Sequence, residues 1–175
     1  MLHSLGMEVF STTRFVVRQW QGDEQDARAC FAIYSNEAVS RWLERPPYRA
    51  LDQARAANLR QLERYTRLVG MGWWPITTRV DGEVIGQAAL MPMDDEPGEV
   101  ELGYHVRHDW WGRGVATEVA RGAIAHARAN LAGYRVVAVT RPHNTGSRRV
   151  MEKAGLLYEG ATVFKGLESV KYGLP

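Results

Sequence analysis

Two glycines, Gly112 and Gly114, lie within the segment HDWWGRGVATEVA, between a predicted strand and a predicted helix. Unpaired backbone N–H groups and the positive end of the helix dipole make such a junction a binding site for an anion. Because glycine has no side chain, an anion can approach the backbone closely. The segment therefore predicts anion binding, and a flexible turn flanked by Trp110 and Trp111 is the alternative.

The segment lacks the complete motifs of two other phosphate-binding folds. Thr117 occupies the position of the third glycine in a GxGxxG dinucleotide fingerprint, and no GK[ST] follows, as a phosphate-loop ATPase requires. No grouping of histidine, cysteine and aspartate has the spacing of metal ligands, so we expect no metal. The single cysteine, Cys30, lies in a helical pattern beside apolar residues, where we expect it to pack as a small apolar side chain.

Length and composition favour one globular domain, residues 1–175. The chain is 45% hydrophobic and 24% charged, and its net charge of +2 is spread along the sequence, so we expect binding to neither nucleic acid nor membrane. No apolar run approaches the roughly 20 residues of a bilayer-spanning helix, and the first ten residues lack a signal-peptide pattern. With the single cysteine, these features favour a cytoplasmic location; the native chain starts at Met1 or Met7.

The first half of the chain predicts a strand and three helices. They cover residues 13–20, 22–36, 37–43 and 52–68. Asp23 is a suitable N-cap for the first helix, Pro46 and Pro47 prevent the second from continuing, and Gly70 follows the third as a stop signal. Strands over residues 73–80 and 83–91 follow, joined by Asp81-Gly82 in a tight two-residue hairpin.

The second half predicts alternating strands and helices. In the strand at 98–107, one face carries Val100, Leu102, Tyr104 and Val106, and the other carries Glu101, Gly103 and His105. A helix ending near Asn130 follows the glycine segment. After it we expect a strand at 134–140, a helix at 145–155 capped by Gly155, and a closing hairpin over 156–164 and 168–174. This order predicts an α/β (α+β) fold whose mixed sheet has helices on both faces.

Five spaced segments carry a further signal: TTRFVVRQW, SRWLERPPY, VELGYHV, WWGRGVATE and NTGSRRVMEKAGL. Together they resemble the GCN5-related N-acetyltransferase (GNAT) superfamily, in particular its RimJ/RimL-like branch of ribosomal-protein N-terminal acetyltransferases. They run in the family's order from about Thr12 to Leu174. Asp109 departs from the family's Gln or Arg, and Leu156 replaces a core Phe. The resemblance implies a mostly antiparallel sheet of about seven strands with a splayed central pair.

The resemblance also implies acetyl-CoA as the donor. The family holds the pantetheine arm between two splayed strands, which here are residues 98–107 and 134–140. The first of these strands should end in a bulge. The expected cofactor-binding residues are Tyr104, His105, Val106, Gly112, Arg113, Gly114, Val115, Ala116, Thr117, Asn144, Ser147, Arg149 and Lys153. Among the basic residues, to which Arg148 also belongs, solvated surface charge is the alternative.

Direct transfer to an amine needs a route for a proton. Glu101 is the first candidate for a general base, because it shares a strand face with Gly103, which leaves room beside it. An ion-paired or solvated carboxylate is the alternative. His105, whose ordinary pKa is about 6.5, is the second candidate base, and a packed, hydrogen-bonded histidine is its alternative.

The departing thiolate needs an acid. Many relatives carry a tyrosine seven residues after Asn144, but this chain has Met151, so the tyrosine mechanism is not expected here. Ser147 matches the serine of the RimJ/RimL-like pattern and can offer its hydroxyl to the sulfur; a serine on the helix surface without a catalytic role is the alternative. Asn144 would bind the pantetheine arm or a water, or cap its helix.

The acceptor is expected to be a primary amine, either a protein N-terminus or a small molecule. The relatives suggest Trp42, Tyr48, Trp73 and Trp74 as residues of its pocket, with core packing as the alternative. A catalytically silent acyl-CoA-binding module and an enzyme for another donor, such as succinyl-CoA, are the competing hypotheses. A homodimer is an expectation from the resemblance.

Overall fold

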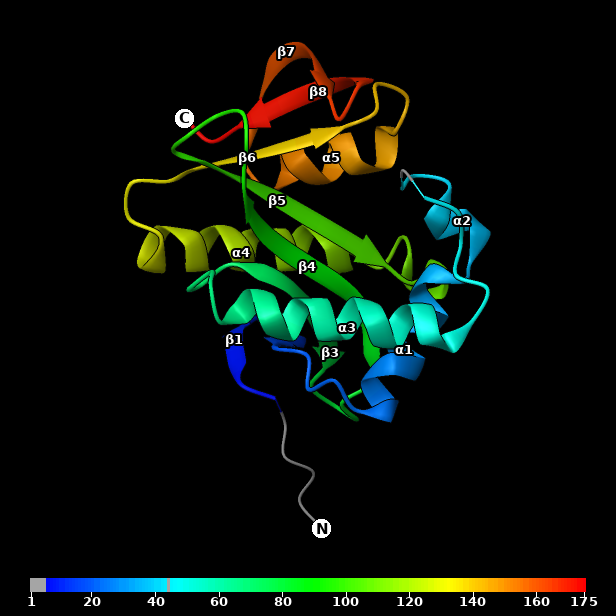
Figure 1. The fold of residues 1–175 in the computed structure, drawn as a ribbon. Helices are drawn as coiled ribbons and strands as arrows, with labels where there is room; N and C mark the ends of the chain where they lie inside the picture. The colour runs from blue at the N-terminus through cyan, green and yellow to red at the C-terminus, as the bar shows by residue number, and fades with distance from the viewer. Residues whose placement is uncertain (1–5, 44) are drawn as a thin grey trace.

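A computed structural model describes residues 6–43 and 45–175. Met1, one of the two expected starts, and Glu44 of the SRWLERPPY segment lie outside the described residues. One mixed sheet in the order β1-β2-β3-β4-β5-β6-β8-β7 runs through the molecule (Figure 1). Its strands are β1 (Glu8–Ser11), β2 (Phe15–Arg18), β3 (Gly72–Thr78), β4 (Val84–Pro92), β5 (Glu99–Val106), β6 (Arg135–Thr140), β7 (Leu157–Phe164) and β8 (Leu167–Gly173).

The sheet has eight strands where about seven were expected, because β1 was not predicted from the sequence. At four residues, β1 is too short to show a clear alternation, and its pairing with β2 contains a register shift between Glu8 and Phe10. All neighbouring strands pair antiparallel except β5 and β6, which are parallel. The predicted α/β class and mixed, mostly antiparallel sheet are confirmed.

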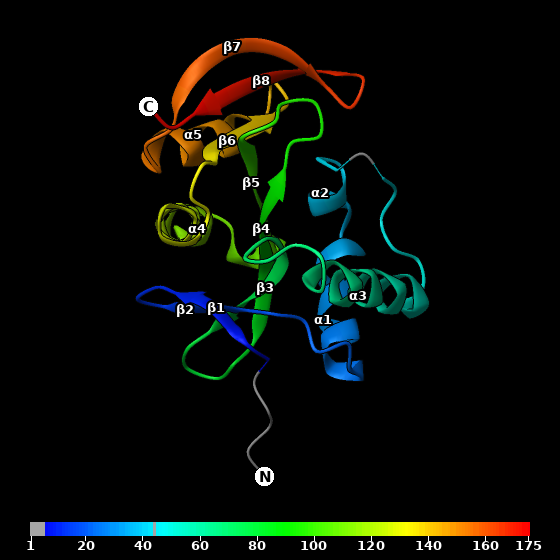
Figure 2. The same cartoon turned by 60° about the vertical axis from the view of Figure 1, so that its left-hand side comes forward.

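Helices cover both faces of the sheet. They are α1 (Glu24–Tyr34), α2 (Glu37–Ser40), α3 (Leu51–Tyr65), α4 (Val115–Asn130) and α5 (Thr145–Lys153), and a short 3-10 helix, η1, spans His108–Trp110. Figure 2 shows α1 and α3 on one face of the sheet and α4 on the other. In the described residues, no helix is both long and apolar enough to cross a membrane.

Helix ends follow the predicted caps in part. Asp23 caps α1 by accepting a hydrogen bond from the Asp26 N–H at 2.8 Å. Gly155, with φ of 97°, follows α5, and the Leu156 N–H bonds the Met151 carbonyl as in a Schellman motif.

The predicted ends of two helices are wrong. Helix α2 ends at Ser40, because the N–H groups of Trp42 and Leu43 bond carbonyls three residues back and form a tighter turn. Helix α3 ends at Tyr65, where the Arg67 N–H bonds the Arg64 carbonyl three residues back in a tighter turn, and Gly70 lies in a later turn.

The loop between β3 and β4 has five residues, 79–83, instead of two. A hydrogen bond between the Thr78 hydroxyl and the Asp81 carboxylate organises this loop, and Gly82 adopts the predicted positive φ. Cys30 is buried as predicted, and burial raises its pKa to about 12, so the thiol stays protonated.

Strands β5 and β6 diverge soon after they begin to pair. Their register contains Glu99↔Arg135, Val100↔Val136 and Glu101↔Val137, and the following residues of the two strands do not pair with one another. The ladder between β4 and β5 is continuous from Gly86↔Val106 to Pro92↔Val100, so it lacks the bulge that the family resemblance implied. The fork between β5 and β6 opens toward the ends from which η1 and α5 follow.

Candidate active site

A cleft of about 1450 Å³ occupies the fork between β5 and β6. It exceeds the roughly 300–1,000 Å³ of sites for drug-sized ligands, so it has room for a long ligand and a second molecule. Its walls come from the segment after α2, the ends of β4 and β5, the glycine loop, α5 and the tip of the β7–β8 hairpin.

The glycine loop forms one end of the cleft. Gly112 and Gly114 both have φ of 75°, in the left-handed region that favours glycine, and Gly114 is the N-cap of α4. A Cβ at Gly112 would meet no heavy atom within 4 Å, so backbone conformation and not packing explains this glycine. The first residues of α4, Val115 to Thr117, line the cleft, and their N–H groups have no partner within the helix, an arrangement that favours an anion.

The loop is braced by residues near the N-terminus, which the sequence analysis had not assigned to the site. Arg14 donates from Nη1 to the Arg113 carbonyl at 3.0 Å and pairs through Nε with Glu118 at 2.7 Å. The Thr12 hydroxyl also donates to Glu118, at 2.7 Å. Burial tends to raise the pKa of Glu118, but the hydrogen bonds from Arg14 and Thr12 outweigh it and lower that pKa. The family-like motifs TTRF and ATE thus supply the two sides of one contact. The presence of both motifs is the sequence signal from which this brace could have been predicted.

The tryptophans before the glycines hold the loop to β5 and the core. Trp111 donates from Nε1 to the Val106 carbonyl at 2.7 Å, and Trp110 packs edge-on against Phe15. Asp109 forms two hydrogen bonds with the Arg107 guanidinium, which lower the pKa of the carboxyl. The residue that departs from the family pattern therefore has a structural partner within the loop.

His105 lies deep in the cleft between aromatic side chains. The Trp73 indole stacks on its ring with centroids 4.6 Å apart, and the Tyr34 hydroxyl lies 2.8 Å from its Nδ1. Gly103 makes room for this arrangement, since a Cβ there would lie 2.7 Å from Trp73 Cη2. Burial, followed by the positive charges of Arg45 and Lys165, lowers the pKa of His105 to about 3, so its imidazole is neutral at working pH.

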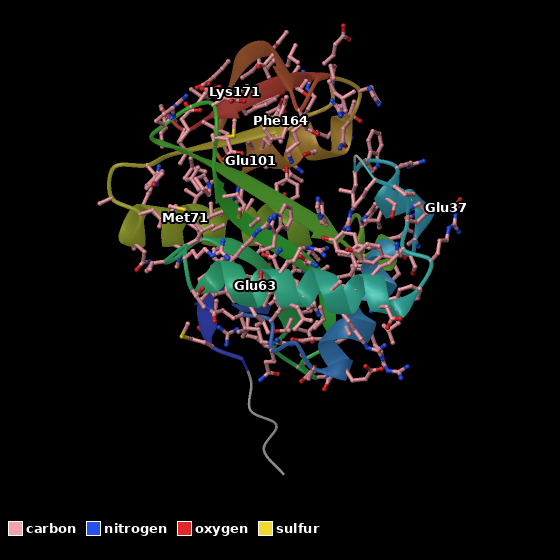
Figure 3. All side chains as sticks on the ribbon, in the orientation of Figure 1. Glu37, Glu63, Met71, Glu101, Phe164 and Lys171 are labelled. Atoms are coloured by element: carbon pink, nitrogen blue, oxygen red, sulfur yellow. The ribbon has the colours of Figure 1, made fainter. Side chains whose placement is uncertain are left out.

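Glu101 stands at the point where the two strands diverge, because it is the last residue of β5 that pairs with β6. It lies on the same face of β5 as His105 and lines the cleft. Figure 3 labels Glu101 on β5 and Phe164 on the β7–β8 hairpin; both side chains line this cleft.

Ser147 lies on the first turn of α5, across the fork from β5. The Asn144 side chain accepts a hydrogen bond from the Ser147 N–H at 3.2 Å, so the Asn144 cap positions this turn. The Tyr104 hydroxyl lies 3.0 Å from both Ser147 Oγ and the Ser147 carbonyl. Tyr104, expected from the sequence only as a cofactor-binding residue, projects from the strand face opposite to Glu101 and reaches α5 through its side chain. Met151 is 2% exposed and belongs to the core beneath.

Most of the predicted site residues meet in this cleft. It is lined by Trp42, Trp73, Glu101, Tyr104, His105, Val106, Gly112, Gly114, Val115, Ala116, Thr117, Asn144, Ser147, Arg149 and Lys153. The Trp42 ring contacts the His143 ring, with centroids 5.5 Å apart, and so connects the segment after α2 with the α5 side of the cleft.

Four predicted residues do not line the cleft. Trp74 is 1% exposed and packs on the opposite face of the sheet, where alternation along β3 directs it. Tyr48 is buried against Tyr34. The Arg113 guanidinium lies over the Trp110 ring, and the Arg113 carbonyl accepts the hydrogen bond from Arg14. Arg148 donates to the Tyr172 hydroxyl and the Pro142 carbonyl, away from the cleft.

No group of three or more His, Cys, Asp or Glu side chains suited to a metal ion occurs within residues 6–43 and 45–175.

Comparison with known proteins identifies the family. The family described as "Acetyltransferase (GNAT) domain" matches residues 14–157. The uncharacterized N-acetyltransferase YoaA of Bacillus subtilis is 28% identical over 152 residues, which cover 87% of this chain and 84% of YoaA. A GNAT-family acetyltransferase structure from Bacillus anthracis matches with a TM-score of 0.78 at 19% identity, covering 94% of this chain and 96% of that one. A structure of RimL, a ribosomal alpha-N-protein acetyltransferase in complex with coenzyme A, matches with a TM-score of 0.75 at 16% identity over 93% and 94% of the two chains. The chain therefore belongs to the GNAT acetyltransferase family, whose members are acyltransferases that use acetyl-CoA.

Proposed function

We propose that this protein transfers an acetyl group from acetyl-CoA directly to a primary amine in the cleft between β5 and β6. The observation that carries the proposal is the fork itself: it joins the glycine loop at one end to Glu101, His105 and Ser147 beside the diverging strands. The RimL likeness, together with the cleft, supports a protein N-terminus or a small molecule as the amine.

The donor end of the cleft suits coenzyme A. Gly112 and Gly114 expose backbone N–H groups for the diphosphate, and Arg149 and Lys153 add cationic side chains from α5. The unpaired part of β5, around Tyr104 and beyond, offers backbone groups to an extended arm. Bound acetyl-CoA would supply the thioester carbon that the amine attacks and the thiolate that leaves.

Glu101 is the proposed general base. An ammonium acceptor must lose a proton before it attacks, and a carboxylate at the fork can take that proton directly or through a water. With a pKa of about 3, His105 is too weak a base to compete, and it instead offers a neutral, fixed imidazole beside the acceptor. Its contacts with Trp73 and Tyr34 keep the ring in one orientation.

Ser147 is the proposed acid for the leaving thiolate. Its hydroxyl lies at the start of α5, where Asn144 and Tyr104 fix its position. Burial raises the pKa of Tyr104, so its phenol stays protonated and can donate to Ser147 Oγ. The pair Tyr104 and Ser147 thereby offers a hydroxyl where Met151 offers none.

Titration with acetyl-CoA and measurement of thiol release over a panel of primary amines test this function. The expected result is amine-dependent thiol release, with Glu101→Gln and Ser147→Ala each lowering kcat while acetyl-CoA affinity changes little. Tight acetyl-CoA binding without turnover on any amine would support the silent acyl-CoA-binding module instead. Donor competition with succinyl-CoA identifies the acyl group, since the preferred donor has the higher kcat/KM.

A further inference from the structure

Two cationic side chains, Arg45 and Lys165, line the cleft. Arg45 belongs to the segment after α2, and Lys165 lies at the turn between β7 and β8. Figure 2 shows this turn on the same side of the molecule as α2, and residues from both segments line the one cleft. The two cations therefore approach the cleft from separate parts of the chain.

Arg45 is held in place by aromatic rings. Its guanidinium carbon lies 4.2 Å from the centroid of the Tyr34 ring and 4.5 Å from that of Tyr48, and its Nη1 donates to the Tyr48 hydroxyl. It is half-buried and forms no ion pair with any acidic side chain in the described part of the chain. The hydrogen bond to Tyr48 uses one of the five N–H donors of the guanidinium, so the fixed side chain has donors left for an anionic ligand.

Lys165 occupies a turn position that its residue type does not favour. With φ of 51° it is the only non-glycine residue of positive φ in the described residues, and Gly166, with φ of 77°, completes the two-residue turn. Its ammonium lies 4.9 Å from the Phe164 ring, and no acidic partner occurs among residues 6–43 and 45–175. A strained backbone position occupied by an unpaired cation at the cleft points to a ligand contact.

Both residues line the same cleft as His105, and their positive charges contribute to lowering the pKa of its imidazole. The cleft also contains carboxylates, namely Glu101, Asp94 and Asp95. These match an ammonium group, but an amine without an anionic group would leave Arg45 and Lys165 facing another positive charge. The complementary acceptor has both an amine and an anion.

We infer that the acceptor carries a carboxylate close to its reacting amine, and that Arg45 and Lys165 bind this carboxylate. The inference rests on the proposed function and specifies its substrate class. A free amino acid, or a peptide whose N-terminal residue is followed by an acidic side chain, has this chemistry. Phe164 and Trp73 add apolar walls for the rest of the molecule.

Matched acceptor pairs test the inference. One pair is phenylalanine and phenylalaninamide; the other is a tripeptide amide with aspartate at its second position and the same peptide with asparagine. The amine of phenylalaninamide is less basic than that of phenylalanine, so a larger fraction of it is neutral and able to attack. This difference favours the amide and therefore works against the inferred preference for the carboxylate. We expect kcat/KM to favour the carboxylate by about tenfold or more in at least one pair, as a charge-assisted contact would. The pair that responds identifies the source, free amino acid or peptide.

Variants connect the preference to these residues. In Arg45→Gln and Lys165→Gln, the carboxylate preference should fall toward one while turnover of the uncharged acceptor persists. Lys165 is an exposed turn residue, so its variant tests the inference even where Arg45→Gln disturbs the packing of Tyr34 and Tyr48. Arg49→Gln is the matched control: Arg49 is exposed, pairs with Glu37 and does not line the cleft, so the preference should stay unchanged.

The possible failures are distinguishable. Acetylation without a carboxylate preference in the wild type, or a preference that both variants retain, overturns the inference and leaves the proposed function intact. Absence of acetylation on every amine, charged or uncharged, overturns the proposed function itself.

Discussion

The Tyr104 hydroxyl orients the proposed acid, and Tyr104→Phe removes it. The hydroxyl lies 3.0 Å from Ser147 Oγ and 3.0 Å from the Ser147 carbonyl. The single Tyr104 proton has two acceptors at this distance, the Ser147 carbonyl and Ser147 Oγ, and whenever it is directed to Oγ the serine proton is available for the cleft. Burial raises the pKa of Tyr104, so the donor is present across the working pH range. The variant retains the ring and the backbone of β5.

The size of the effect follows from one hydrogen bond. A neutral hydrogen bond contributes about 0.5–1.5 kcal/mol, which corresponds to roughly a 2- to 13-fold decrease in kcat for Tyr104→Phe. A positioned acid contributes on the order of 100-fold or more, so Ser147→Ala should lower kcat by about 100-fold. Because Tyr104 acts through Ser147, the double variant should be as slow as Ser147→Ala and no slower.

Thiol release at saturating acetyl-CoA and acceptor gives kcat, and titration with coenzyme A gives affinity, which should change little. Urea unfolding of each variant controls for loss of structure. With acetyl thioesters of more acidic thiols as donors, the loss of kcat in both variants should be smaller, because such thiolates can leave without first receiving a proton. If the losses in the two single variants multiply in the double variant, Tyr104 does not act through Ser147 and the reasoning is refuted.

Three further predictions concern pH, space and the glycine loop. In the unfolded chain His105 takes up a proton near its ordinary pKa of about 6.5, whereas the folded His105, with a pKa of about 3, stays neutral. The free energy of unfolding should therefore fall by up to about 2 kcal/mol as the pH is lowered from about 7.5 to about 5. In His105→Gln, the free energy of unfolding measured in urea should lack this pH dependence. An identical pH slope in the variant and the wild type contradicts the lowered pKa of His105. Gly103→Ala should displace Trp73 and lower kcat/KM by roughly tenfold, as small misplacements do. Adding Trp73→Phe to this variant should restore part of the lost kcat/KM. Unchanged kinetics in Gly103→Ala would refute the contact. Arg14→Gln should raise KM for acetyl-CoA by about three- to tenfold while the free energy of unfolding changes by less than about 1 kcal/mol, because the Arg14 side chain is 45% exposed; an unchanged KM shows that the brace is not needed.

Short-range patterns in the sequence predicted much of the scaffold. Alternation along β5 separates the buried Val100 and Leu102 from Glu101, because a strand with one buried face has a period of two. Asp23 and Asn144 cap their helices as expected, since each cap depends only on residues three positions away. The same patterns failed at the ends of α2 and α3 and at the β3–β4 loop, where individual hydrogen bonds decide the boundary.

Contacts between distant residues supply what the sequence did not predict. Tyr34 reaches His105 across 71 positions, and Arg14 reaches Glu118 across 104. Neither pairing has a local periodic signal, and each depends on how the helices pack on the sheet. The low pKa of His105 follows from such packing, which is why its ordinary pKa made it a more attractive base in the sequence than in the fold.

The central claim is that this cleft moves an acetyl group from acetyl-CoA to the nitrogen of a primary amine. Mass spectrometry of an amine panel after incubation with acetyl-labelled acetyl-CoA, with the wild type and with Ser147→Ala, tests it most directly. The predicted result is a labelled N-acetyl product with an equal amount of free coenzyme A, formed much more slowly by the variant. A wild-type protein that binds acetyl-CoA but labels no amine, or a variant as fast as the wild type, would contradict the account.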